Sequence, residues 1–226
     1  MNAWLAHIDG ILRRAAWVTA SSDVRRVLAR LALQLVLFGL LYGVAMGSYR
    51  AVFAQPQWLL QIVYSAAKVP LLLSATFVIS LPSFYVVNAL LGLRSDFTSA
   101  LRSLVAAQAG LAIVLASLAP FTLLWYATST AHNLALLFNG LMFAIASFAA
   151  QWLVRTYYRP LISRNYRHRW VLWAWLIVYT FVGIQMAWLL RPFIGAPGME
   201  VRFLRPDPWD NAYEFVARLV WQALFP

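Results

Sequence analysis

Residues 65–92 read SAAKVPLLLSATFVISLPSFYVVNALLG, and this stretch decides which kind of fold the chain adopts. After Lys68 it carries no charged side chain, as expected of a transmembrane helix of about 20 residues. The apolar region begins earlier, at Trp58, so a single helix over 58–92 would be about 52 Å long. Because the hydrocarbon core of a bilayer is about 30 Å thick, we expect this region to break or to leave the membrane.

Two placements of this membrane span compete. A span over 58–80 puts Lys68 near the bilayer centre, at a cost of about 2.5–3.5 kcal/mol. A span over 70–92 puts Pro70 in the first helical turn, where proline is tolerated, and leaves Lys68 at the interface. We favour the second placement, with 58–67 as a short interfacial or re-entrant helix. Lys68 then marks the boundary between that helix and the span.

Arg50 and Lys68 flank the same loop, on the side of the membrane opposite the N-terminus. The simpler interpretation is that both side chains anchor the chain by extending toward the membrane surface. The alternative is that the pair holds an anion, a lipid phosphate or a carboxylate of a partner.

Four more apolar runs accompany this stretch, at 28–49, 103–126, 133–154 and 170–190. The chain is 63% hydrophobic and 11% charged, whereas soluble domains are about half apolar and a quarter charged. The predicted fold class is therefore an all-α integral membrane protein with a bundle of about five transmembrane helices.

The two ends of the chain have amphipathic patterns. Residues 1–27 are predicted to be an N-terminal amphipathic cytoplasmic segment, because apolar residues recur there at helical spacing. Residues 28–192 form the transmembrane helical domain. Residues 193–226 form an outside tail, in which Asp207 and Pro208 begin a second amphipathic helix.

The basic residues predict the orientation of the chain. With five spans, 12 of the 18 Lys and Arg residues fall on the N-terminal side and 6 on the other. The positive-inside rule then predicts a cytoplasmic N-terminus and an outside C-terminus, in a membrane such as the bacterial inner membrane. The net charge of +11 is expected to face anionic membrane lipids. We expect no binding to nucleic acid, because no basic stretch lies in a soluble domain.

The densest positive charge lies between the fourth and fifth spans, in the stretch RTYYRPLISRNYRHR. We predict a cytoplasmic loop whose arginines each attract the anionic leaflet by about 1 kcal/mol, or together dock an acidic partner. These arginines are Arg155, Arg159, Arg164, Arg167 and Arg169.

Glycines recur every four residues in the first span, at Gly39, Gly43 and Gly47. This spacing leaves three bare backbone patches on one helix face, where another helix can approach closely. That helix belongs either to the same chain or to another protein. The pattern indicates packing rather than chemistry.

Pro82 lies in the middle of the second span and is expected to kink it. Ser83, Tyr85 and Asn88 follow closely, and transporters build sites from broken helices lined by polar groups. The simpler interpretation is a structural proline, with Asn88 bonded to a neighbouring helix.

The sequence predicts no catalytic, cofactor or metal site. No acidic residue lies in a predicted span, whereas ion-coupled carriers usually carry one there. The three histidines are far apart, cysteine is absent, and the HExxH, GxSxG and P-loop motifs are missing. These observations argue against an enzyme.

Two stretches resemble bacterial multi-span proteins of the Yip1-like family. They are KVPLLLSATFVISLPSFYVVNALLG at 68–92 and RPFIGAPGMEVRFLRPDPWDNAYEFV at 191–216. The five spans, the cytoplasmic N-terminus and the short outside tail resemble the same family. The resemblance implies a non-enzymatic membrane protein that shapes, scaffolds or helps to traffic other components, and it carries over no active-site residue.

From these patterns we expect a non-catalytic accessory or scaffold subunit of a membrane complex. Its expected partners are other membrane protein subunits or further copies of the chain, together with anionic lipids. The first alternative is a small transporter or channel whose path runs near the kink at Pro82. The second alternative is a membrane enzyme of an unrecognised kind.

Overall fold

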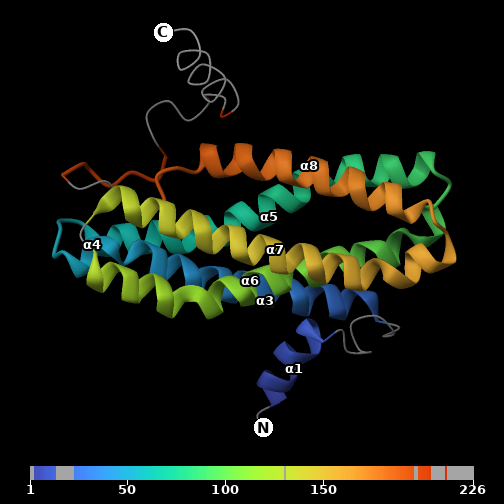
Figure 1. The fold of residues 1–226 in the computed structure, drawn as a ribbon, viewed down its shortest axis with the longest axis horizontal. Coiled ribbons are helices and arrows are strands. Elements are labelled where there is room, and N and C mark those ends of the chain that lie inside the picture. The colour runs from blue at the N-terminus through green and yellow to red at the C-terminus, as the bar shows by residue number, and fades with distance from the viewer. Residues whose placement is uncertain (1–2, 14–22, 130, 196–197, 205–211, 213–226) are drawn as a thin grey trace, which may run out of the picture.

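The structure of the protein is a computed structural model that describes residues 3–13, 23–129, 131–195, 198–204 and 212. Within these residues every regular element is a helix. Five helical segments are long and apolar enough to cross a membrane. They lie along the long axis of the molecule (Figure 1), so the predicted all-helical membrane fold with five spans is confirmed.

Short connections join the five spans. The first span consists of α3 and the single turn α4, and the 3-10 turn η1 leads from the second span into the third. Their bounds are Val24–Gly47 (α3), Tyr49–Val52 (α4), Trp58–Leu90 (α5), Arg94–Asp96 (η1), Phe97–Thr128 (α6), His132–Arg164 (α7) and His168–Leu189 (α8).

The predicted amphipathic end segments are described only in part. The first contains α1, Ala3–Leu12, which projects from the bundle in Figure 1. The last turn of α1 is docked, because Ile11 is buried and its carbonyl accepts a 2.7 Å hydrogen bond from the Tyr157 hydroxyl. The second predicted helix, from Asp207 onward, lies outside the described residues except for Ala212.

The spans form a curved row whose order differs from the order in the sequence. α3 packs on both α5 and α6, α7 packs on α6, and α8 packs on α5. The order across the row is therefore α8, α5, α3, α6, α7. Although only residues 165–167 separate α7 from α8 in the sequence, these two helices stand at opposite ends of the row and share few contacts.

The second span differs from the prediction. α5 is one helix from Trp58 to Leu90 with Pro70 and Pro82 inside it. The separate helix at 58–67 and the span start at Pro70 are therefore both wrong. The physical reason is packing, since the first half of α5 lies along α3 within the bundle.

The prediction that a helix over 58–92 is too long for one span also fails. The 33 residues of α5 extend about 50 Å, but α6 and α7 have 32 and 33 residues and are about as long. The whole bundle is therefore longer than the hydrocarbon core, and such a mismatch is accommodated by tilt and by helix ends that lie outside the core.

Three glycines of α3 lie against α5 of the same chain; they are Gly39, Gly43 and Gly47. A Cβ atom added at Gly43 would lie 2.5 Å from the Ser65 carbonyl oxygen and 2.6 Å from the Ala66 Cα. One added at Gly47 would lie 2.8 Å from the Ile62 Cα. The glycines thus permit a backbone-to-backbone approach that no other residue allows without displacing a helix.

The fourth span is longer than predicted. α7 continues to Arg164, so most of the predicted loop over 155–169 is helical. A buried stripe at helical spacing explains the extension, because Val154, Tyr157, Tyr158 and Leu161 pack into the bundle on one face of α7. The polar arginines between them do not stop a helix whose opposite face is anchored in this way.

A buried polar network ties α7 to α3 and α6. The Asn139 side chain donates a 2.7 Å hydrogen bond to the Tyr126 hydroxyl and accepts a 3.1 Å bond from the Tyr42 hydroxyl. The Tyr126 hydroxyl in turn donates to the Met46 carbonyl at 3.2 Å. Hydrogen bonds between membrane helices contribute up to about 2 kcal/mol each, so this network fixes α7 at its end of the row.

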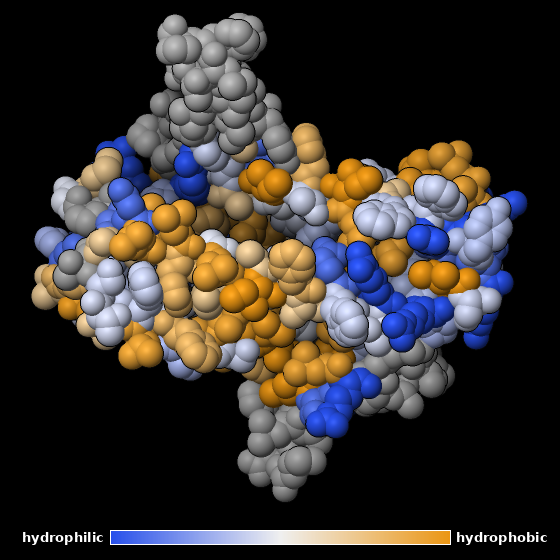
Figure 2. Space-filling model, viewed as in Figure 1, coloured by the Kyte–Doolittle hydropathy of each residue, from blue (hydrophilic) through white to orange (hydrophobic). Residues whose placement is uncertain are grey.

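The two ends of the bundle differ in character. We call the end that contains residues 91–96 and 155–169 the basic end, and the end that contains residues 48–58, 189–195 and 198–204 the tail end. Figure 2 shows hydrophilic residues gathered over the basic end, on the right, and apolar residues over much of the middle of this face. This distribution is the one expected of spans that emerge from a membrane into a charged interface.

Candidate functional site

A large cavity lies between α7 and α8, and we call it the lateral groove. It has a volume of about 910 Å³ and is lined by α5, α6, α7 and α8, by residues 191–195, and by Met199, Glu200 and Arg202. It exists because α7 and α8 diverge from their common turn to pack on different neighbours, as Figure 1 shows. Figure 2 shows the hollow between the apolar residues of this face.

One face of each outer helix lines the lateral groove. On α7 the lining residues recur every three or four positions, among them Leu136, Gly140, Phe143, Ser147 and Gln151. On α8 they run from Trp175 to Trp188 with the same spacing. Since residues three and four apart share a helix face, both helices present a continuous, mostly apolar stripe to the groove.

Two glycines make room in the groove walls. A Cβ added at Gly140 would meet nothing within 4 Å, and one added at Gly183 would make only an ordinary 3.4 Å contact with Thr76. These glycines therefore differ from those of α3, because their absent side chains leave open space rather than a helix contact.

Buried polar side chains are part of the groove lining. Gln61 and Thr76 of α5 and Gln108 of α6 are each at most 6% exposed. The Tyr179 hydroxyl of α8 donates to the Gln108 amide oxygen at 3.0 Å, which links α8 to α6 across the floor of the groove. This bond holds α8 against the floor of the groove.

At the tail end the chain folds back over the bundle. We call residues 191–195 and 198–204 the strap. The Lys68 ammonium group donates to the Pro192 carbonyl, and Gln61 and Ser65 both donate to the Phe193 carbonyl. These three side chains of α5 are almost fully buried and share one helix face, so they bind the strap through its backbone.

Lys68 is therefore not the interfacial anchor that we predicted. Its side chain is 0% exposed, and its Nζ atom lies 5.1 Å from the Phe203 ring centre and 6.0 Å from that of Phe193. A cation surrounded by carbonyl oxygen and aromatic faces is stabilised without reaching water. The lysine thus holds the strap rather than a lipid.

Arg50 also differs from the anchoring interpretation, because it is 2% exposed. Its Nη2 atom donates to the Met199 carbonyl at 2.7 Å, and its Nε atom donates to the Gln55 amide oxygen at 3.1 Å. Arg50 and Lys68 therefore act in the same region, as predicted, but both bind backbone oxygens of the strap.

Charged side chains of the strap lie at the mouth of the groove. Arg191 stacks on Trp188, with its guanidinium carbon 3.3 Å from the ring centre. Arg202 forms a 2.9 Å ion pair with Glu200, and both are exposed. Arg191, Glu200 and Arg202 all line the groove, so one end of an apolar cavity is charged.

The residues near the predicted kink are not brought together. Pro82, Ser83 and Tyr85 are exposed on the outer surface of α5, whereas Asn88 is buried. Asn88 donates to the Phe84 carbonyl of its own helix at 2.9 Å. None of these four residues lines the lateral groove.

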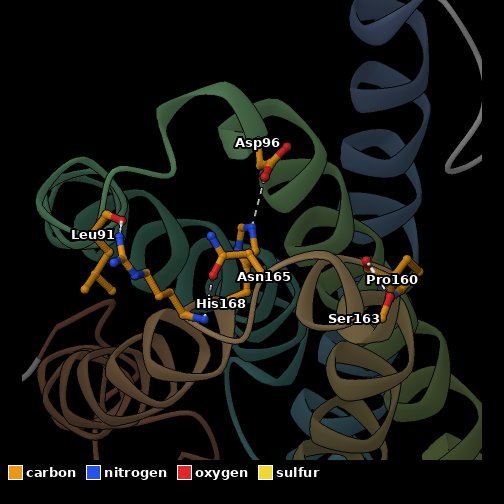
Figure 3. Close-up of polar contacts among 7 residues, drawn as sticks. Leu91, Asp96, Pro160, Ser163, Asn165 and His168 are labelled. Carbon is orange, nitrogen blue, oxygen red and sulfur yellow. Dashed lines mark hydrogen bonds and ion pairs between the residues drawn. The ribbon is translucent and has the colours of Figure 1, made fainter.

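All five arginines of the stretch 155–169 are exposed at the basic end. The turn between α7 and α8 is fixed beside them, because His168 contacts the Asp96 carboxylate at 3.1 Å and Arg167 donates to the Leu91 carbonyl at 3.3 Å (Figure 3). The Arg167 amide also donates to the Asn165 side chain at 3.1 Å. The turn thus rests on the connection between α5 and α6, and the exposed arginines around it face outward, where a leaflet or a partner could reach them.

No protein-family model, no curated protein and no solved structure matches this chain. The resemblance to Yip1-like proteins stays a prediction. Among the residues that the structure describes, no three His, Asp or Glu side chains are grouped so that they could hold a metal ion.

Sequence reasoning missed the lateral groove and the contacts of Gln61, Ser65 and Lys68 with the strap. A signal for these contacts was present, since Gln61, Ser65 and Lys68 recur at intervals of four and three residues. Three polar side chains on one face of an apolar helix indicate a polar contact inside the membrane protein. The carbonyl groups that they bind could not be located from the sequence, because they lie more than 120 residues away.

Proposed function

We propose that the protein is a non-catalytic accessory protein of the membrane that holds a lipid in the lateral groove. The observation that carries this proposal is the groove itself, an apolar cavity of about 910 Å³ between two transmembrane helices with a charged mouth. Ligand sites are typically clefts of about 300–1,000 Å³ with mostly apolar walls and a few polar groups. A lipid has the matching distribution of apolar and polar parts.

The distribution of charge along the groove favours a lipid over an apolar transmembrane helix of a partner. Arg191, Glu200 and Arg202 line the mouth, whereas the lining toward the basic end carries no charged side chain. A lipid has one polar head and apolar chains, and so matches this division of the groove into a charged end and an apolar length.

Filling the groove tests this proposal. The substitution Gly140→Trp is expected to remove most of the tightly bound lipid, by about tenfold or more, because its side chain would occupy space that is open in the structure. The measurement is native mass spectrometry of the full chain purified in mild detergent, with bound lipid counted per protein. Leu141→Trp is the matched control, since Leu141 is 53% exposed on the same helix and does not line the groove.

Equal lipid content in the two tryptophan variants and the wild type would show that the groove holds no lipid. If Gly140→Trp instead releases a stoichiometric partner protein and Leu141→Trp does not, the scaffold function replaces the lipid-holding function.

We also propose that the basic end faces the cytoplasm and the tail end faces outside. The basis is the excess of arginine at the basic end, which the positive-inside rule places on the cytoplasmic side. Because the chain has no cysteine, single cysteines report orientation cleanly. We expect Ala131→Cys to react with an impermeant maleimide in intact cells and Ser163→Cys to react only after permeabilisation. The reverse pattern would overturn the orientation.

A further inference from the structure

We infer that the lateral groove selects an anionic phospholipid, and that Arg191 and Arg202 at its mouth set this selection by binding the lipid phosphate. This selection rests on the proposed function, because the lipid is the one that the groove holds. Lipids with the same hydrocarbon chains should therefore differ in affinity according to their headgroups.

The charged side chains of the groove lining lie together at the tail end. Among the residues that the structure describes, the only Arg, Lys, Asp or Glu side chains in the lining are Arg191, Glu200 and Arg202. Because a charge is costly in apolar surroundings, a charged headgroup is stabilised at this end alone. The chains of the lipid then run along the apolar walls toward the basic end.

Positive charge exceeds negative charge around the mouth. The described residues of the tail end include three arginines, Arg50, Arg191 and Arg202, and one carboxylate, Glu200. In the proposed orientation this end faces outside, where the positive-inside rule gives no reason for an excess of arginine. Binding of an anion at the mouth accounts for the excess.

Lys68 adds a buried positive charge behind the mouth. Its side chain is 0% exposed and donates to the Pro192 carbonyl, and Pro192 itself lines the groove. None of the ion pairs among the described residues includes Lys68. Salt screens a buried charge much less than an exposed one, so this cation contributes a positive potential at the strap. That potential favours a phosphate at the mouth without any contact between the phosphate and Lys68.

The surroundings of Arg191 suit contact with a headgroup. Its guanidinium carbon lies 3.3 Å from the Trp188 ring centre, and its Nε atom donates to the Trp188 carbonyl at 3.4 Å. A guanidinium group has five N–H donors in one plane and binds phosphate oxygens through charge-assisted hydrogen bonds. Stacking on an aromatic face is compatible with such in-plane bonds, so Arg191 can bind a phosphate while it stays on Trp188.

The ion pair between Arg202 and Glu200 distinguishes two classes of headgroup. Both side chains are exposed, and exposed ion pairs are weak, so a phosphate can compete with Glu200 for Arg202. The rival occupant is a zwitterionic headgroup, whose ammonium group would pair with Glu200. The excess of arginine favours the anionic headgroup, because a zwitterion brings no net charge to a positive mouth.

The test compares two lipids with the same chains, dioleoyl phosphatidylglycerol and dioleoyl phosphatidylethanolamine, on the purified full chain by native mass spectrometry. We expect the wild type to bind the anionic phosphatidylglycerol more tightly by about fivefold, as one additional charge interaction implies. Arg191→Gln should at least halve this preference, and Arg191→Lys, which keeps the charge, should retain it. Arg191→Gln combined with Arg202→Gln should reduce the preference to about one. Glu200→Gln, which removes the neighbouring negative charge, should increase it.

Each possible result decides a different point. Equal binding of the two lipids, with both reduced by Gly140→Trp, would contradict the headgroup selection and leave the proposed function intact. Tighter binding of phosphatidylethanolamine that Glu200→Gln abolishes would show a zwitterionic headgroup instead. Displacement of phosphatidylglycerol by an equal concentration of glycerol phosphate would show that the mouth binds a soluble anion. If Gly140→Trp changes the binding of neither lipid, the headgroup selection and the proposed function both fail.

Arg169→Gln is the matched control for the arginine variants. It removes one positive charge from the basic end, where the side chain is exposed and outside the groove lining. The affinities for both lipids should stay unchanged. An equal loss of preference in Arg169→Gln and Arg191→Gln would mean that net charge, and not the mouth of the groove, sets the selection.

Discussion

Replacing Gly43 with leucine is expected to prevent the formation of the five-helix bundle. A Cβ atom at this position would lie 2.5 Å from a carbonyl oxygen and 2.6 Å from a Cα atom of α5. Both atoms belong to the backbone, so no side chain can move aside to make room. Overpacking usually costs about 1–3 kcal/mol, and a leucine that must separate two helices along their contact should exceed this range. Size-exclusion chromatography in mild detergent should show loss of the monodisperse protein.

A graded series makes this prediction sharper. Gly43→Ala should still fold but should lower the free energy of unfolding in a detergent titration by about 1–3 kcal/mol. Gly140→Ala is the matched control, because its Cβ meets nothing within 4 Å and its helix gains propensity of up to about 1 kcal/mol. If Gly43→Ala were as stable as Gly140→Ala, the close approach of α3 and α5 would be refuted.

The features that the sequence predicted well are those set by local physics. Uncharged runs of about 20 residues identify spans because a charged side chain in lipid is costly wherever the span packs. Glycines spaced by four residues identify a helix face, and Gly39, Gly43 and Gly47 do lie on one contact with α5. Neither inference needs knowledge of which helix becomes the neighbour.

The features that the sequence could not predict depend on partners far away in the chain. The unbroken α5 follows from contacts of its first half with α3, and those contacts outweigh a length argument made for one helix alone. The lateral groove follows from α8 packing on α5 while α7 packs on α6. By hydropathy α7 and α8 are ordinary spans. The space between them arises because they pack on different helices.

The surroundings of Lys68 also depend on a distant part of the chain, the strap. A lysine in an apolar run is costly in lipid, so the sequence alone predicts that its side chain lies at the membrane interface. Lys68 is instead stabilised inside the protein, because a backbone carbonyl and two aromatic rings replace the water around its ammonium group. The sequence reading therefore placed this residue near the correct end of the bundle but with the wrong surroundings. The strap in turn positions Arg191 and Arg202, so the mouth of the groove depends on a buried lysine.

Lys68→Glu is expected to release the strap from the bundle. The substitution places a carboxylate where the Pro192 carbonyl now accepts a hydrogen bond, and two oxygen acceptors cannot bond to each other. Leaving an uncompensated charge in a buried site costs about 3–5 kcal/mol. Lys68→Met is the matched variant, since it keeps an unbranched side chain of similar length and removes the donor and the charge without adding a negative one. We expect it to cost much less, about 1–3 kcal/mol for the carbonyl left unpaired.

A cysteine at Val201 measures the release directly. Val201 is 7% exposed, and its amide donates to the Gln57 side chain at 3.1 Å, so Val201→Cys should react slowly with maleimide in the otherwise unchanged protein. In the Lys68→Glu background the rate should rise at least tenfold, and in the Lys68→Met background it should rise less. A cysteine at Ala100, which is 0% exposed near the basic end, should react equally slowly in all three backgrounds and so excludes global unfolding. An unchanged Val201→Cys rate with Lys68→Glu would mean that the other bonds to the strap, from Gln61, Ser65 and Arg50, hold it without the lysine.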